Sequence, residues 1–140
     1  MTYKLTIEQK PTYLYATVTG WNSKENVMRY LEEIRSACRA SGCFRVLIEE
    51  RLEGPRLGTQ DVFEIASQGS SRARGVPKAI AYVDVNAGGD LMMSFAENVA
   101  VNRGLPVTVF STVVEAERWL LDEGSRTEPR AAADADSPHR

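Results

Sequence analysis

The only histidine in the 140-residue sequence is His139, in a C-terminal stretch that we expect to be disordered. The predicted folded part therefore has no imidazole. This absence excludes nucleophile pairs of the Ser-His and Cys-His kinds and the usual zinc sites. No other catalytic motif stands in their place. We therefore expect a protein that is not an enzyme, with no catalytic residue, no metal ion and no cofactor.

The sequence also has few cysteines, a small net charge and no long apolar run. Cys38 and Cys43 are the only cysteines, and because their spacing fits no zinc or redox motif we expect two reduced thiols. The net charge of −2 gives no reason to expect a nucleic-acid partner, since proteins that bind nucleic acids carry a basic face. No apolar run approaches the roughly 20 residues of a membrane span, and the first residues lack the apolar core of a signal peptide. We expect a cytoplasmic protein that is not transmembrane.

The stretch from Phe44 to Ala66 organises the chain. An almost unbroken apolar run over residues 44–48 ends in Glu49 and Glu50, and a polar loop with glycine and proline follows over residues 52–58. Thr59 then opens a helical pattern. A strand that is apolar on both faces implies helices above and below it. Open α/β sheets bind their ligands at the carboxyl ends of such strands, so we expect the functional surface there.

Further strands and helices alternate along the chain. The expected strands cover residues 3–9, 13–19, 44–50, 79–83 and 106–110. The expected helices begin at Asn22 or Ser23, Thr59, Asp90 and Thr112, and end at Gly42, in a frayed stretch from Gly69, at Gly104 and before Gly124. Apolar residues recur at helical spacing in the first helix, at positions 27, 31, 34 and 38.

The order β-β-α-β-α-β-α-β-α predicts an α/β domain with a mixed, mostly parallel five-stranded sheet and helices on both faces. The short turn at Pro11 makes the first strand antiparallel to the second. Right-handed crossovers fix the remaining chirality. We place the domain at residues 1–123. Residues 124–140 lack apolar periodicity, and we interpret them as a disordered tail or a tag scar.

Three blocks carry a resemblance to a known family. They are residues 13–20, residues 95–104, and Val109-Phe110 followed by Glu115-Ala116 and Trp119-Leu120. In this order and spacing the chain resembles the STAS superfamily, and more closely its small, stand-alone SpoIIAA-like bacterial proteins, which resemble anti-sigma-factor antagonists. The resemblance covers roughly residues 2–121.

The resemblance implies a non-enzymatic, regulatory role. STAS domains bind protein partners, sometimes nucleotides, and some are switched by phosphorylation of a serine in the turn that opens the second helix. The corresponding turn here is Gly58-Thr59-Gln60-Asp61, in which only Thr59 offers a hydroxyl group. Thr59 is therefore the candidate phosphorylation site, with a plain helix cap as its alternative role. The related CRAL-TRIO lipid-carrier fold implies an apolar ligand instead.

We expect the partner or ligand to bind at the carboxyl edge of the sheet. The candidate residues are Trp21, Leu57, Gly58, Thr59, Asp84, Gly88 and Gly89. An exposed tryptophan suits a partner or an apolar ligand, although core packing also accounts for Trp21. The Gly88-Gly89 loop before a helix could cradle an anion, although a plain turn also accounts for it.

Two sets of charged residues are further candidates, the first of them at this edge. The carboxylates could hold a divalent cation or raise one another's pKa values, or could be solvated strand ends and caps; they are Glu49, Glu50, Asp61, Asp84 and Asp90. The arginines border the central loop and the end of the second helix, where they could dock an acidic partner or phosphate, or could form a solvated rim; they are Arg51, Arg56, Arg72 and Arg74.

We therefore expect a regulatory module that acts through protein–protein interaction. The alternative is a small carrier that binds an apolar or lipid-like ligand at the carboxyl edge of the sheet. An enzyme that uses the clustered carboxylates is the least favoured hypothesis. The oligomeric state is open, and a homodimer is among the alternatives.

Overall fold

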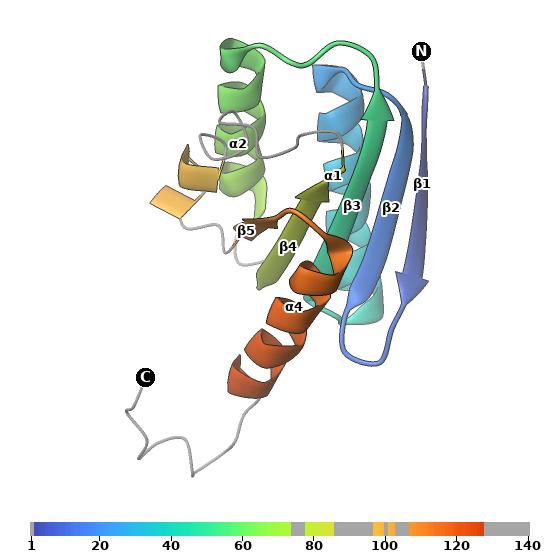
Figure 1. Ribbon diagram of the computed structural model, residues 1–140, viewed down its shortest axis with the longest axis vertical. Helices are drawn as coiled ribbons and strands as arrows, with labels where there is room; N and C mark the ends of the chain where they lie inside the picture. The colour runs from blue at the N-terminus through green and yellow to red at the C-terminus, as the bar shows by residue number, and fades with distance from the viewer. Residues whose placement is uncertain (1, 74–77, 86–96, 100, 103–106, 128–140) are drawn as a thin grey trace.

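The computed structural model describes residues 2–73, 78–85, 97–99, 101–102 and 107–127, and for residues 69–73 and 123–127 only the helical backbone (Figure 1). The elements follow in the order β1 (Tyr3–Gln9), β2 (Leu14–Trp21), α1 (Lys24–Ser41), β3 (Arg45–Glu53), α2 (Thr59–Ala73), β4 (Ala79–Asp84), β5 (Val107–Phe110) and α4 (Val113–Thr127). Between β4 and β5, residues 97–99 and 101–102 are helical. None of the described helices is long and apolar enough to cross a membrane.

One mixed sheet of five strands forms the centre of the fold, as predicted. The strands lie in the order β1-β2-β3-β4-β5. β1 pairs with β2 in antiparallel fashion, and β2 to β5 are parallel. Val46 and Ile80 are partners in the β3–β4 register and both are buried. The two apolar strands identified in the sequence are therefore neighbours in the interior.

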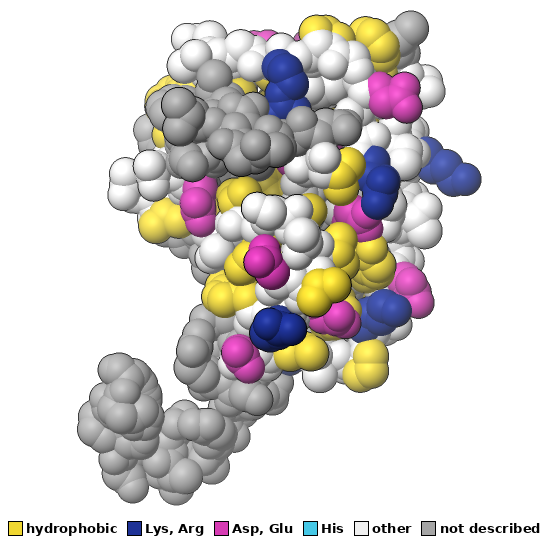
Figure 2. All heavy atoms as spheres, in the orientation of Figure 1, with side chains coloured by type: hydrophobic (Ala, Val, Ile, Leu, Met, Phe, Trp, Pro, Cys, Tyr) yellow, Lys and Arg dark blue, Asp and Glu magenta, His cyan; other side chains and the backbone are white. Residues whose placement is uncertain are grey.

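Helices cover both faces of the sheet, as the sequence predicts (Figure 1). Side chains at alternate strand positions, among them Ala16, Val46 and Ile80, meet Tyr30 and Ile34 of α1 in one core. The opposite positions meet α4 in a second core; its buried members are Tyr13, Leu47, Ala79, Ala81, Val83, Ala116 and Leu120. The space-filling view of the α4 face shows hydrophobic, basic and acidic side chains interspersed (Figure 2).

Local sequence signals fix three of the helix ends. The Ser23 side chain accepts a hydrogen bond from the amide of Asn26 and caps α1, whose C-cap is Gly42 with φ of 75°. Thr112 accepts at Oγ1 from the amide of Glu115 at 3.2 Å and caps α4. Such a capping side chain typically contributes about 1 kcal/mol. Asn22, the other candidate for the α1 cap, donates instead to a loop carbonyl described below.

Four predicted boundaries are too early. β2 continues through Gly20 to Trp21, two residues beyond its predicted end. β3 continues through residues 51–53, because Leu52 returns to the α1 face and is buried there. α2 continues through Gly69 to Ala73, so the glycine and serines at 69–71 do not fray it. α4 runs to Thr127 and includes the first four residues of the segment that we assigned to the tail, 124–127. Residues 128–140 lie outside the described part of the chain.

Gly20 allows β1 and β2 to approach closely. It has φ of +120°, and a Cβ atom there would lie 2.5 Å from the Tyr3 Cα and 2.6 Å from the Thr2 carbonyl oxygen. Both contacts are with backbone, which cannot rotate away. Glycine therefore keeps the strand paired up to Trp21, whose amide donates to the Thr2 carbonyl at 3.0 Å.

We predict that Gly20→Ala lowers the free energy of unfolding by roughly 1–3 kcal/mol, because alanine is strained at this φ and collides with β1. Urea unfolding followed by tryptophan fluorescence measures the change. Gly58→Ala is the matched control, since a Cβ atom at Gly58 meets nothing within 4 Å. Equal effects of the two substitutions would contradict this account of Gly20.

Candidate functional site

The carboxyl ends of the parallel strands share one edge, as expected. β2 ends at Trp21, β3 at Glu53 and β4 at Asp84. Trp21 is the register partner of Glu53, and Glu50 that of Asp84. Residues 54–58, which we call the edge loop, leave this edge after β3 and lead into α2. Trp21, Asp84 and the edge loop therefore belong to one region of the fold.

The edge loop is fastened to the junction between β2 and α1. The Asn22 amide donates to the Glu53 carbonyl at 2.7 Å, and Asn22 Nδ2 donates to the Pro55 carbonyl at 2.9 Å. The Trp21 ring lies against Gly54, where an added Cβ would come within 3.0 Å of three ring atoms. Gly54 also has φ of +107°. Trp21 is half-buried.

The edge loop is also fastened to β4. Arg56 Nη1 lies 3.3 Å from Asp84 Oδ2, in an ion pair whose arginine side chain is 45% exposed and whose aspartate side chain is 6% exposed. Asp84, expected on the binding surface, is thus largely covered. Its carboxylate anchors the loop, because a buried charge requires a compensating partner.

The loop ends at the start of α2. Leu57 is half-buried and packs against the α1-side core. The Gly58 carbonyl accepts from the Val62 amide at 3.0 Å, so Gly58 is the N-cap of α2. Thr59 is the first helical residue and is exposed. Its hydroxyl therefore lies at the amino terminus of a helix, where the exposed amide groups favour negative charge. Gly88 and Gly89 lie outside the described residues.

A buried polar cluster lies beneath this edge, between the sheet and α1. The Tyr30 hydroxyl, from α1, donates to Glu50 Oε2 at 2.5 Å and lies 3.4 Å from the Tyr82 hydroxyl. Glu50 is 6% exposed and Asp84 is 8% exposed. These two residues face the same layer from adjacent strands, and we call them the carboxyl pair.

Burial raises the pKa of Glu50 to about 7, and the nearby charge of Asp84 and a hydrogen bond with it add to the rise. Hydrogen bonds from Tyr30 and Tyr82 act in the opposite direction. Burial also raises the pKa values of Tyr30 and Tyr82 well above the usual value, and the adjacent Glu50 charge adds to both shifts. Glu50 can therefore take up or release a proton near neutral pH.

The five carboxylates expected at this edge do not all come together. Glu49 faces the α4 side, where it accepts hydrogen bonds from the Tyr15 hydroxyl and, at 2.6 Å, from Arg51 Nε. Successive residues of a strand point to opposite faces, which separates Glu49 from Glu50. Asp61 lies in the first turn of α2, and Asp90 is outside the described residues. Among the residues that the structure describes, no group of three metal-ligating side chains is suited to hold an ion.

The four arginines do not form one rim either. Arg51 pairs with Glu49 on the α4 face and Arg56 with Asp84. The side chain of Arg72 and the whole of Arg74 are outside the described part. Cys38 and Cys43 are free thiols, as predicted, and burial raises the pKa of Cys38 to about 11.

Tyr30 and Tyr82 were not among the candidate residues predicted from the sequence. Tyr30 lies between Val27 and Ile34 on the apolar stripe of α1, and Tyr82 lies on the Glu50 face of β4. A buried tyrosine needs a hydrogen-bond partner for its hydroxyl group. The carboxylates that end β3 and β4 were available as partners, so the signal was a tyrosine on a core stripe facing acidic strand ends.

No protein-family model matches the chain, and no curated protein matches it.

The titration of Glu50 should be visible in the pH dependence of the free energy of unfolding. The folded-state pKa of about 7 lies above the usual 4.5, so folding favours the protonated form. The contribution of Glu50 to the free energy of unfolding is present in full below the unfolded-state pKa. It is lost as the pH rises through the folded-state pKa. Between about pH 5 and about pH 8 the wild-type free energy of unfolding should therefore fall.

Glu50→Gln should remove this decline, because the amide is neutral throughout and still accepts from Tyr30. We expect Glu50→Gln to be more stable than the wild type at about pH 8, by urea unfolding at several pH values. Glu53→Gln, an exposed change on the same strand, is the control and should keep the wild-type profile. If the free energy of unfolding of Glu50→Gln fell with rising pH as it does in the wild type, a group other than Glu50 would be responsible for the decline.

Proposed function

We propose that the chain is a non-enzymatic binding module of STAS type that recognises a protein partner at the carboxyl edge of its sheet. The recognition surface comprises Trp21, Thr59 and the edge loop, including Leu57 and Gly58, with Asp84 as the anchor beneath. The fastening of the edge loop to the β2–α1 junction and to β4 carries this proposal. Two hydrogen bonds from Asn22 and the Arg56–Asp84 ion pair hold a loop whose residues other than Leu57 are exposed.

A loop held in this way binds with less loss of conformational freedom than a mobile one. The surface also offers chemistry suited to a protein partner. The partly exposed Trp21 ring supplies an amphipathic contact of the kind found at interface hot spots. The exposed Thr59 hydroxyl supplies a place where phosphorylation would add negative charge at a helix amino terminus and change the surface that a partner meets.

The buried cluster favours this proposal over the apolar carrier. A carrier pocket under α2 would lie on the face of the sheet that also holds Glu50, Tyr82 and Asp84. Their polar groups are satisfied by one another and by Tyr30 and Arg56. An apolar ligand there would separate these partners and leave buried polar groups unsatisfied, which is costly. The low exposure of the carboxyl pair likewise supports a structural rather than a catalytic role.

Gly58→Arg tests the recognition surface. The position is exposed, a Cβ atom added there meets nothing within 4 Å, and arginine would add bulk and charge to the edge. We expect proteins captured from an extract of the source cells by the wild-type chain to be lost with Gly58→Arg. Ser41→Arg, an equal change at the exposed last residue of α1, should retain them.

Capture that does not distinguish these two variants would overturn the proposal. Native mass spectrometry of the same preparations tests the carrier hypothesis. A mass above that of the denatured chain, with an apolar compound released on denaturation, would favour the carrier. Labelling of Thr59 by kinase activity in the extract, absent from Thr59→Val, would support control by phosphorylation.

A further inference from the structure

β1 is the last strand on its side of the sheet. Tyr3, Leu5 and Ile7 face the α1-side core, and Lys4, Thr6 and Glu8 are exposed on the other face. The Tyr3 hydroxyl donates to Glu33 of α1, which fastens the start of the strand. β1 is therefore an ordered strand with one edge paired to β2 and one edge facing outward.

The hydrogen bonds with β2 show which backbone groups face outward. The Lys10 amide donates to the Tyr13 carbonyl at 2.8 Å, and the Thr2 carbonyl accepts from Trp21 at 3.0 Å. Hydrogen-bonded positions alternate along an antiparallel pair. The even-numbered residues of β1 therefore bond to β2, and the amide and carbonyl groups of Tyr3, Leu5, Ile7 and Gln9 point to the outer edge.

The strand is self-complementary in one register. If two copies pair antiparallel with Thr6 opposite Thr6, then Leu5 meets Ile7, Tyr3 meets Gln9, and Lys4 meets Glu8 of the second copy. The odd positions then form the hydrogen-bonded pairs, as their outward direction requires. Lys4 and Glu8 fall at non-hydrogen-bonded pairs, where side chains approach most closely.

Neighbouring registers lack this match. A shift that places Ile7 opposite Ile7 brings Lys4 against Lys10, which pairs like charges. A shift that places Leu5 opposite Leu5 brings Lys4 against Thr6 and leaves Glu8 against Thr2. Opposite charges on facing strands stabilise a pair and like charges destabilise it. Only the Thr6-centred register satisfies both the backbone and the charges along the whole strand.

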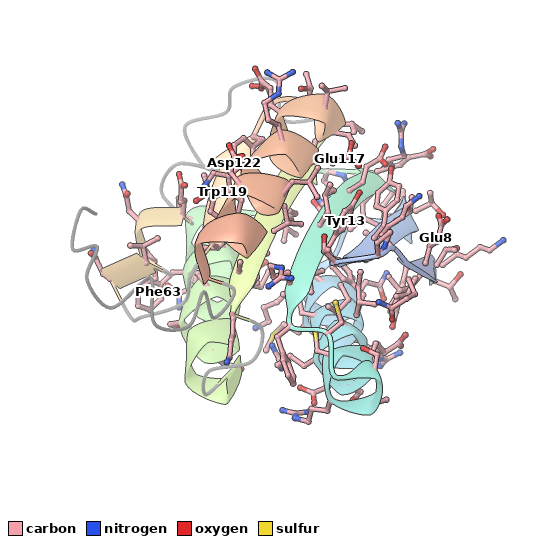
Figure 3. The ribbon with its side chains drawn as sticks, turned by 90° about the horizontal axis from the view of Figure 1, so that it is seen from below. Glu8, Tyr13, Phe63, Glu117, Trp119 and Asp122 are labelled. Carbon is pink, nitrogen blue, oxygen red and sulfur yellow. The ribbon has the colours of Figure 1, made fainter. Side chains whose placement is uncertain are left out.

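We propose that two copies of this chain associate through β1 in an antiparallel pair centred on Thr6. Lys4 of each copy pairs with Glu8 of the other, and the two sheets continue into one. Glu8 already lies 3.3 Å from Lys10 within the chain, and its side chain is 61% exposed, so a second cation can reach it. Glu8 lies on β1 at the margin of the molecule (Figure 3). Basic and acidic side chains both occur along this margin (Figure 2).

The arrangement leaves the recognition surface open. An antiparallel strand pair is related by a two-fold axis normal to the sheet. The parallel strands of the two copies then run in opposite directions, and their carboxyl edges lie at opposite ends. A single strand pair buries less than the roughly 1,200 Å² of a standard interface. We therefore expect reversible association in the micromolar range.

Charge exchange tests the register. We expect Lys4→Glu and Glu8→Lys each to raise the dimer dissociation constant about tenfold or more, since each makes two like-charge contacts. The double variant restores opposite charges and should return to within about threefold of wild type. Lys78→Glu, the same change at the start of β4, is the control and should have no effect. Sedimentation equilibrium on the full chain measures each constant.

Cross-linking locates the two-fold axis. In a Cys43→Ser background, Thr6→Cys should form a disulfide-linked dimer under mild oxidation, since facing residues at such a pair have Cα atoms about 4.5 Å apart. Lys4→Cys, which faces Glu8 instead of itself, should cross-link far more slowly. A chain that stays monomeric at high micromolar concentration would overturn the proposal. Equal cross-linking at positions 4 and 6, or no recovery in the double variant, would overturn the register.

Discussion

The carboxyl group of Glu50, enclosed between the sheet and α1, is the constraint to which the surrounding structure responds. An ionised carboxylate taken out of water costs several kcal/mol unless it is paired, hydrogen-bonded or neutralised. The fold uses hydrogen bonding and neutralisation. Tyr30 donates to Glu50 from α1, and burial beside Asp84 raises its pKa to about 7. The position of α1 over the sheet therefore depends on a polar contact as well as on apolar packing.

The strand order determines what the rest of the surface looks like. Because β2, β3 and β4 follow one another in the sheet, the right-handed crossovers that contain α1 and α2 carry both helices over the same face. α4 follows the last strand and covers β3, β4 and β5 from the other side. The polar side of β1 is thereby left in solvent, and its side chains Lys4, Thr6 and Glu8 are exposed. The same topology that builds two cores also leaves an ordered strand edge at the margin.

Much of the fold could be predicted because its signals are local. Alternation in β1 and β2, the continuous apolar runs of β3 and β4, and the caps at Ser23, Gly42 and Thr112 each depend on a few neighbouring residues. The end of β3 was predicted too early because pairing with β2 carries it on to Glu53, and pairing is a long-range property. α2 extends through Gly69 although glycine disfavours helix interiors.

The candidate site was predicted only in outline, for the same reason. The sequence places carboxylates at the ends of β3 and β4, but which of them lie side by side across the two strands depends on strand register. Alternation along β3 separates Glu49 from Glu50, and the β3–β4 register brings Glu50 beside Asp84. The contribution of Tyr30 could not be read from its neighbours either, because its partner is 20 positions away.

Arg56 connects the buried cluster to the surface above it. Its guanidinium group holds the edge loop to Asp84, and Asp84 contributes to the raised pKa of Glu50. A charge at Asp84 therefore has two effects: it attracts the loop and it disfavours ionisation of Glu50. Protonation of Glu50 removes the repulsion between its charge and that of Asp84, the residue that pairs with Arg56. The attachment of the edge loop and the raised pKa of Glu50 thus both depend on Asp84, which lies beside Glu50 at the end of β4.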